Sequence, residues 1–168
     1  LIFATGYDGL TGSLSAFEVT GRDGKTVKDK WCDGARSYLG LMLAGFPNLF
    51  MTAGPNGPVA LANLIRINEH DVDWIAEAIA HAERRSALTV EVSSEAEDRW
   101  MELVYQLAKR TLYTKAKTWY VGTNVIGKAQ GLSMYTGGFG KYREYCKSVS
   151  NDGYAGIDFM TQKDVKHA

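Results

Sequence analysis

The sequence has few of the residues from which metal sites and disulfide frameworks are built. Only two cysteines, Cys32 and Cys146, and three histidines occur among 168 residues. The two cysteines lack metal-type spacing, which favours free thiols in a reducing compartment and leaves a disulfide between them as the alternative. His70 and His81 lie on one predicted helix without the His-Glu-x-x-His pattern, so we expect surface histidines and no metal site.

The chain also lacks an excess of charge and a long apolar run. Nineteen basic residues balance nineteen acidic ones. Phosphate-backbone binding needs a basic patch, so nucleic acid is excluded as an expected partner. The longest apolar run, near residues 39–46, is far shorter than the roughly 20 residues of a membrane span. No secretory signal is visible, and we expect a cytoplasmic protein without a membrane partner.

No constellation of side chains for acid, base or nucleophilic catalysis is present. A Gly-x-Ser-x-Gly elbow is missing, and Cys146 has no histidine at a diagnostic spacing. We therefore predict no catalytic side chain within this chain. If the chain serves an enzyme, a cofactor carries the chemistry and the protein supplies position and electrostatics.

What is present predicts an α/β unit. Short apolar or alternating runs bounded by glycine predict strands at residues 1–5, 14–20, 25–27, 48–53 and 153–160, with a turn at Arg22-Asp23-Gly24. Three- and four-residue apolar spacing predicts a long helix over residues 59–85, with Pro58 in its first turn. We expect residues 1–168 to form one structural unit whose strands belong to a larger sheet.

Two further helices and a loop complete this prediction. Ser94 and Glu97 suggest a capping box for a helix over residues 94–110, with an apolar stripe that includes Trp100 and Val104. A shorter helix is expected from about residue 139 to 149. The aperiodic, glycine-containing segment 111–133 between them is typical of a functional loop.

Two segments partly match nucleotide-binding motifs, but each lacks a residue that the motif requires. Residues 122–128 nearly match the phosphate-binding loop, but Ala129 replaces the hydroxyl residue that binds magnesium. Gly138 and Gly140 precede a helix, yet Arg143 replaces the third glycine of a dinucleotide fingerprint. We therefore expect neither a triphosphatase nor a complete dinucleotide site.

Three segments together resemble a known family. They are Ala4-Thr5-Gly6, then Ala53-Gly54-Pro55-Asn56-Gly57-Pro58, then the pattern Trp-Tyr-x-Gly-x-Asn-x-x-Gly-Lys at residues 119–128. In this order they resemble the C-terminal third of the Baeyer–Villiger monooxygenases, which use FAD and NADPH. Ile126 departs from the proline usual in that family.

The resemblance implies a C-terminal segment of an FAD-binding domain. It belongs to an enzyme that converts ketones to esters or lactones with NADPH and O2 through a C4a-peroxyflavin. The cofactor-binding residues implied are Thr5, Gly6, Gly54, Pro55, Asn56, Gly57, Ala60, Leu61, Trp119, Asn124 and Lys128. Those of the substrate pocket are Val59, Ala60, Leu61 and Leu64. The segment at Gly57 to Leu61 is expected to aim a helix N-terminus at the flavin.

Other family elements are not found in this sequence. Both nucleotide fingerprints and the active-site arginine of the family are expected upstream of Leu1, so the missing N-terminal portion is the predicted partner, with a small ketone and O2 as substrates. The segment alone is predicted to be inactive. Two alternatives remain: a related N-hydroxylating or sulfur-oxidising flavin monooxygenase, and a non-catalytic remnant that serves as an interaction module.

Overall fold

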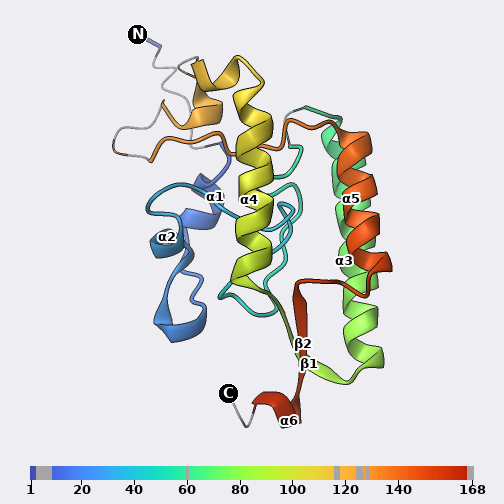
Figure 1. The fold of residues 1–168 in the computed structure, drawn as a ribbon. Helices are drawn as coiled ribbons and strands as arrows, with labels where there is room; N and C mark the ends of the chain where they lie inside the picture. The colour runs from blue at the N-terminus through green and yellow to red at the C-terminus, as the bar shows by residue number, and fades with distance from the viewer. Residues whose placement is uncertain (3–8, 60, 116–117, 124–126, 128, 166–168) are drawn as a thin grey trace.

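Irregular chain between helices provides much of the interior of this protein. The computed structural model describes residues 1–2, 9–59, 61–115, 118–123, 127 and 129–165. The long helices are α3 (Leu64–Arg84), α4 (Ser94–Lys109) and α5 (Phe139–Asn151). Figure 1 shows α3 and α5 side by side, with α4 apart from them and irregular chain in the space between. Five buried residues of that chain fill the space: Tyr38, Leu39, Leu41, Met42 and Ala44.

Two short strands form the sheet that the described residues contain. Strand β1 (Ala87–Val92) pairs antiparallel with β2 (Ile157–Thr161), with Val90 opposite Phe159. β2 confirms the strand expected near the C-terminus. β1 was not predicted, although Thr89 to Val92 alternate in polarity and follow a helix end, which is a usual strand signal.

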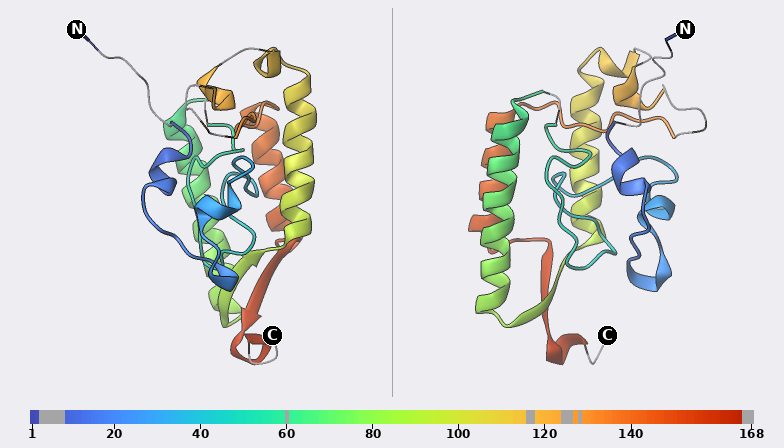
Figure 2. Two further views of the ribbon diagram at one scale, coloured as in Figure 1. Left: turned by 90° about the vertical axis from the view of Figure 1, so that its left-hand side faces the viewer. Right: turned by 180° about the vertical axis from the view of Figure 1, so that it is seen from behind.

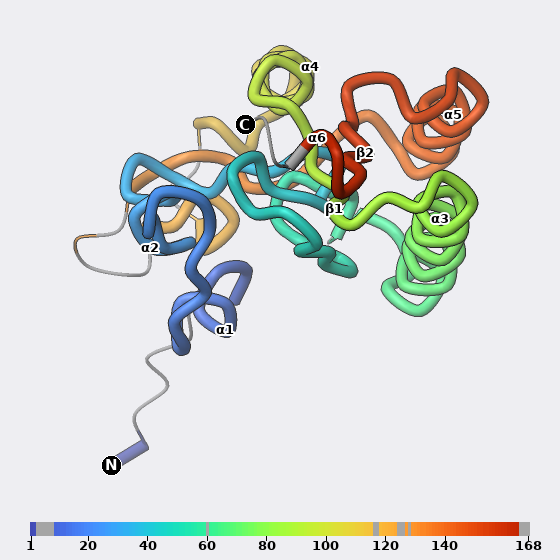
Figure 3. The backbone as a smooth tube through the Cα atoms, turned by 90° about the horizontal axis from the view of Figure 1, so that it is seen from below, coloured from blue at the N-terminus to red at the C-terminus, as the bar shows by residue number. Residues whose placement is uncertain are grey.

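The N-terminal part of the chain is helical where strands were expected. Short helices α1 (Gly12–Ser15) and α2 (Val27–Lys30) lie beside each other on the side of α4 opposite α3 and α5 (Figures 2 and 3). Thr26 and Asp29 form a capping box that starts α2, so the strand predicted at 25–27 is wrong. The predicted strand at 14–20 is reduced to one bridge between Thr20 and Thr26 around the expected turn, a 3₁₀ turn η1 (Arg22–Gly24).

Two other segments predicted as strands, 48–53 and 1–5, are not strands among the described residues. Segment 48–53 makes one bridge, between Met42 and Phe50. Its end residues Asn48 and Ala53 have φ values of 61° and 47°, which an extended strand does not tolerate. Leu1 and Ile2 are fully exposed and lie outside both described strands, while residues 3–5 lie outside the described part of the chain.

Helix starts also differ from the predictions. The Asn63 side chain accepts hydrogen bonds from the N–H groups of Ile65 and Arg66 at 3.0 and 3.3 Å, so α3 begins at Leu64 and not near Pro58. Ser93, one residue before the predicted cap, accepts from the Ala96 N–H and starts α4. Elsewhere the helix predictions are confirmed, including the end of α3 and the buried Trp100 and Val104 on α4.

Glu97, expected to take part in a capping box, lies instead in the protein interior. Its carboxylate is fully buried, accepts from Ala44 N–H at 3.2 Å, and pairs with Lys30 at 2.8 Å and Arg36 at 2.9 Å. These contacts attach the N-terminal segment to α4. A buried carboxylate is tolerated only where cations and donors surround it, and Glu97 has both.

The two described histidines are partly buried, and the two cysteines differ in exposure. His81 packs between Tyr154 and Phe159, with ring centroids 5.0 and 4.8 Å away, and burial lowers its pKa. His70 is also half-buried, so the prediction of solvated surface histidines is wrong. Cys32 is exposed and Cys146 is buried, and both are free, as predicted. None of the described helices is long and apolar enough to cross a membrane.

We expect folding stability to fall at alkaline pH. Burial raises the pKa of Cys146 to about 12 and raises the pKa of Tyr142 well above 10.0. The unfolded chain therefore releases these protons at lower pH than the folded chain, and stability is lost as pH rises through the unfolded pKa values. The urea midpoint should be lower at about pH 10.5 than at about pH 8; equal midpoints would contradict this burial effect.

Candidate functional site

The segment Gly54 to Gly57 forms a tight turn that rests directly on a second piece of backbone. Gly54 N–H donates to Gly40 O at 3.1 Å, and a Cβ at Gly40 would lie 2.8 Å from Gly57 Cα. Side chains would separate the two segments, so glycine at position 40 is needed for this approach. This segment is one of the three that carry the family resemblance.

Three non-glycine residues at this turn have left-handed backbone conformations. The φ values are 60° at Leu39, 47° at Ala53 and 67° at Asn56. Each such residue costs about 1–3 kcal/mol and persists only where surrounding contacts fix it. The turn is therefore held by the rest of the chain, and its shape is a property of the folded unit.

Buried polar side chains supply these contacts. Ser37 Oγ donates to Pro55 O at 2.6 Å and accepts from Gly40 N–H at 3.1 Å. On α3, Asp71 Oδ2 accepts from Ala53 N–H at 2.9 Å and Oδ1 accepts from Tyr142 Oη at 3.1 Å. Ser37 and Asp71 are both at most 1% exposed. Together they connect α3 and α5 to the two ends of the turn.

Replacing Asp71 with alanine should lower the free energy of unfolding by about 1–3 kcal/mol. Alanine has no acceptor, so the Ala53 N–H group loses its partner, whereas Tyr142 Oη keeps Leu39 O as an acceptor at 2.9 Å. Urea unfolding measures the change. Asp73→Ala, at an exposed position on the same helix, is the matched control and should leave the midpoint unchanged.

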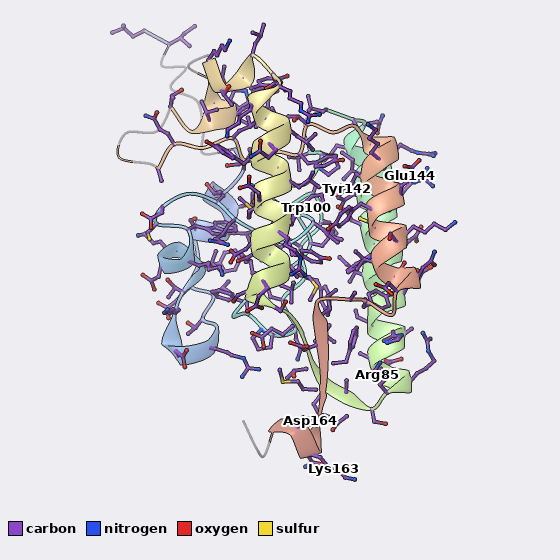
Figure 4. The ribbon with its side chains drawn as sticks, in the orientation of Figure 1. Arg85, Trp100, Tyr142, Glu144, Lys163 and Asp164 are labelled. Carbon is purple, nitrogen blue, oxygen red and sulfur yellow. The ribbon has the colours of Figure 1, made fainter. Side chains whose placement is uncertain are left out.

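Aromatic residues from α4 and the following chain cover the other side of the turn. Trp100 is fully buried, stacks on Tyr135 with centroids 5.2 Å apart, and donates from Nε1 to Asn56 O at 3.3 Å. Figure 4 shows Trp100 and Tyr142 facing each other between α4 and α5. Tyr135 N–H donates to Gly57 O at 2.8 Å. The turn is thus fixed from both faces.

The Asn56 side chain is the exception in this well-bonded region. It is fully buried, and neither Oδ1 nor Nδ2 has a hydrogen-bond partner among the described residues. Such groups are rare in folded proteins because each costs the desolvation of a polar atom. Asn56 therefore has unused hydrogen-bonding capacity at the centre of the turn.

The loop after α4 reaches the same turn. Apart from the 3₁₀ turns η2 (Tyr113–Lys115) and η3 (Trp119–Val121), its described residues form neither helix nor strand. Ser133 N–H donates to Tyr120 O at 3.3 Å, and Ser133 O accepts from Asn56 N–H at 2.8 Å. Ser133 thus joins η3 to the turn.

Trp119 remains open to solvent beside this junction. Its side chain is 43% exposed, stacks on Tyr120 with centroids 4.0 Å apart, and lies close to Gly9. Trp119 is therefore not part of the buried core. Two of the three segments on which the family resemblance rests, the turn and η3, are thus near one another, while Ala4-Thr5-Gly6 lies outside the described residues.

Other predicted site residues lie at the surface or outside the described residues. Leu61 and Leu64 are 40% and 51% exposed, and Val59 is half-buried. Thr5, Gly6, Ala60, Asn124 and Lys128 lie outside the part of the chain that the structure describes.

One predicted feature of this site is wrong. Because α3 begins at Leu64, the described residues between Gly57 and Leu61 form no helix N-terminus. The N–H groups of Gly54, Asn56 and Gly57 are also used in internal hydrogen bonds. The turn therefore offers a fixed shape and nearby side chains. The dipole of α3 does not act at Gly57, because the helix begins only at Leu64.

A cavity of about 580 Å³ lies on the other side of Ser133, between α4 and residues 30–36, 114–115, 121, 123 and 130–133. Lys30, Arg36 and Lys115 line it, with Tyr105 and Leu132 among the other wall residues. None of the described residues predicted for the cofactor or the substrate lines it. The cavity borders the candidate site through Val121 of η3 and Ser133.

Sequence comparison identifies similar proteins over nearly the whole chain. No protein-family model matches. The chain is similar to cyclohexanone 1,2-monooxygenase of Acinetobacter sp., with 35% identity over 167 residues, or 99% of this chain. It is 39% identical to a Baeyer–Villiger monooxygenase of Pseudooceanicola batsensis and 40% identical to phenazine N-monooxygenase PhzNO1 of Lysobacter antibioticus, each over 94% of the chain. The chain spans only 28–30% of the length of these relatives.

Solved structures agree with the sequence comparison. Cyclohexanone monooxygenase from Rhodococcus sp. Phi1 bound to NADP+ superposes with a TM-score of 0.91 at 39% identity, over 96% of this chain and 30% of that one. Steroid monooxygenase bound to NADP gives 0.85 at 40% identity, over 93% and 29%. An OTEMO complex with FAD and NADP gives 0.86 at 31% identity, over 94% and 29%. In sequence and in fold, the chain is therefore homologous to the C-terminal part of the Baeyer–Villiger flavoprotein monooxygenases.

Proposed function

We propose that this chain is the C-terminal part of the FAD-binding domain of a monooxygenase that converts ketones to esters or lactones with NADPH and O2. The observation that carries the proposal is the rigid turn at Gly54 to Gly57, joined through Ser133 to a loop that exposes Trp119. The cyclohexanone and acetone monooxygenases among the similar proteins support this reaction class.

The described side chains fit a flavin and a nicotinamide nucleotide. A flat ring system needs apolar surface and a few polar contacts at fixed positions. Leu61 and Trp119 offer exposed apolar surface next to the turn, and Asn56 has unused hydrogen-bonding capacity. When bound, FAD supplies the oxygen-transfer chemistry and NADPH supplies the hydride.

In this proposal, the chain's own residues shape and cover the site. Gly54, Pro55, Asn56 and Gly57 form a fixed wall beside the flavin, together with Thr5 and Gly6. Trp119 covers the nicotinamide nucleotide with its indole face, and its N–H group donates to a hydroxyl of that ligand. Asn124 and Lys128 belong to the same covering loop. The remaining N-terminal portion of the enzyme, a small ketone and O2 are the partners, in the cytoplasm.

Oxidation at nitrogen is the second candidate. It is favoured by the 40% identity to phenazine N-monooxygenase PhzNO1, which equals or exceeds the identity to the ketone-oxidising relatives. Overall similarity therefore does not distinguish the two substrate classes. Product analysis with a ketone and with phenazine separates them.

A fusion protein tests the proposal. The part of Acinetobacter cyclohexanone 1,2-monooxygenase that the alignment does not cover is joined to Leu1 of this chain. The fusion should show flavin absorbance and ketone-dependent consumption of NADPH, whereas residues 1–168 alone should hold no stoichiometric FAD. A folded fusion without flavin, or a flavin-saturated preparation of residues 1–168 alone, would contradict the proposal and favour a non-catalytic interaction module.

Changes of side-chain size at Val59 and Leu61 should alter substrate preference in this fusion. Discrimination in an apolar pocket is worth about 1–3 kcal/mol per methylene, so Val59→Ala and Leu61→Ala should change the ratio of kcat/KM between small and large ketones. Leu61 is 40% exposed, so stability should change little. If the ratios equal those of the unmodified fusion, these residues lie outside the pocket.

A further inference from the structure

Helix α3 carries more apolar surface than this chain covers. Its buried side faces α5 and the irregular chain through Ile67, Trp74, Ala78 and Ala82. Ile65, Val72 and Ile79 also lie on α3, yet they are 70%, 54% and 43% exposed. A surface helix usually carries one apolar stripe that faces its own core. The second stripe of α3 therefore needs a separate explanation.

The three exposed residues form a line along the helix. They are spaced seven residues apart, and successive positions at this spacing differ by only about 20° around an α-helix. Ile65, Val72 and Ile79 thus form one continuous face, which we call the outer face of α3. The charged residues Arg66 and Asp73 each lie about 100° further round the helix than the outer-face residue before them. Glu69, four residues after Ile65 and three before Val72, borders the outer face.

A buried polar atom accompanies the outer face. Asn68 Oδ1 is shielded from solvent and has no hydrogen-bond partner among the described residues. Asn68 follows Ile65 by three residues and precedes Val72 by four, so it lies beside these residues on the helix surface. An asparagine within an apolar helix face is a known device for fixing the register of a partner.

We propose that the outer face of α3 is the surface on which the rest of the flavoprotein, the part bearing its nucleotide-binding segments, packs. The chain matches about 30% of the length of its relatives and shares its fold with one of them at a TM-score of 0.91, so this fold occurs in proteins that contain a further 70% of chain. The exposed residues Leu61 and Leu64 extend the face to the candidate site. This inference rests on the proposed function and adds the docking surface to it.

A second copy of this chain is the competing occupant. Two outer faces could pair around a twofold axis, because a symmetric dimer uses the same patch on both subunits. The outer face also continues toward the turn where the proposed cofactor would lie. A partner that completes the cofactor site must contact that end of α3, and we therefore favour the rest of the flavoprotein.

Thiol labelling tests the proposal. In a Cys32→Ser background, Val72→Cys places a thiol on the outer face and Asp73→Cys places one on the adjacent charged side, and Cys146 is buried. Both thiols should react rapidly with a maleimide in residues 1–168. In the fusion protein, position 72 should react at least about tenfold more slowly because a covered thiol reacts only through rare openings, while position 73 remains accessible.

Equal labelling of the two positions in a folded fusion would overturn the proposal. Protection of position 72 in residues 1–168 alone, rising with protein concentration, would assign the face to a second copy. This readout needs neither flavin nor turnover. A fusion that protects position 72 but oxidises no ketone contradicts only the proposed function, and an active fusion without protection contradicts only the docking surface.

A second measurement does not depend on the fusion. Residues 1–168 should bind the dye ANS at the outer face, and the triple variant Ile65→Gln, Val72→Gln, Ile79→Gln should lose this binding while keeping its helical circular dichroism. The control variant Arg66→Gln, Glu69→Gln removes an exposed ion pair from the same helix without changing net charge. ANS binding that is equal in the triple and control variants would show that the face is not an accessible apolar surface.

Discussion

Trp100→Ala is expected to lower the free energy of unfolding by about 3–5 kcal/mol, because it removes a large, fully buried side chain and leaves a cavity. The indole fills the space between α4, Tyr135 and Tyr142. It also donates a hydrogen bond to Asn56 O, so its loss releases one face of the turn at Gly54 to Gly57. Urea unfolding followed by circular dichroism measures the loss.

Two variants separate packing from the hydrogen bond. Tyr105→Ala removes an aromatic residue that is 55% exposed on the same helix and should leave the midpoint nearly unchanged. Trp100→Phe keeps most of the packing but removes the donor, which should cost about 1–3 kcal/mol because a buried carbonyl loses its partner. A loss for Trp100→Ala no larger than that for Tyr105→Ala is incompatible with the described core.

Trp119→Ala, unlike Trp100→Ala, should lower activity and leave stability nearly unchanged. In the fusion protein, loss of the covering indole should lower ketone oxygenation by about 100-fold, since small errors in reactant position can cost this much. Stability and FAD content should remain close to those of the unmodified fusion because Trp119 is 43% exposed. Product formation, NADPH consumption and peroxide release should be measured together with the melting temperature.

Trp119→Phe provides the matched control for this prediction. It keeps an aromatic face but lacks the N–H donor, so partial recovery would assign the remaining loss to the hydrogen bond. If Trp119→Ala turns over ketone normally per folded molecule, Trp119 does not take part in the site. A large drop in melting temperature would instead indicate an anchoring role.

The sequence predicts the helices better than their starts. Apolar spacing identifies α3, α4 and α5 because helices bury regularly spaced side chains. The starts depend on which polar residue caps the helix. Asn63 caps α3, well after Pro58, and Ser93 caps α4 in place of Ser94. Neither choice is visible from apolar spacing alone.

The interior of the candidate site was harder to predict. The family resemblance singles out Gly54 to Gly57, but no local pattern shows that Ser37, Asp71 and Tyr142 hold this turn in its strained conformation. These contacts join residues that are distant along the chain, so they appear only in the folded structure. Asp71 alone carries a signal, since a carboxylate on the buried side of a helix usually has a structural partner.

Product analysis with isotopically labelled O2 tests the central claim most directly. The fusion of this chain with the remaining part of Acinetobacter cyclohexanone 1,2-monooxygenase is supplied with cyclohexanone, NADPH and the labelled gas. The proposed function predicts a lactone that contains one labelled oxygen atom, and no product from residues 1–168 alone. A folded, flavin-containing fusion that consumes NADPH but releases only peroxide, with neither cyclohexanone nor phenazine oxygenated, would contradict the assignment of this chain as the C-terminal part of such a monooxygenase.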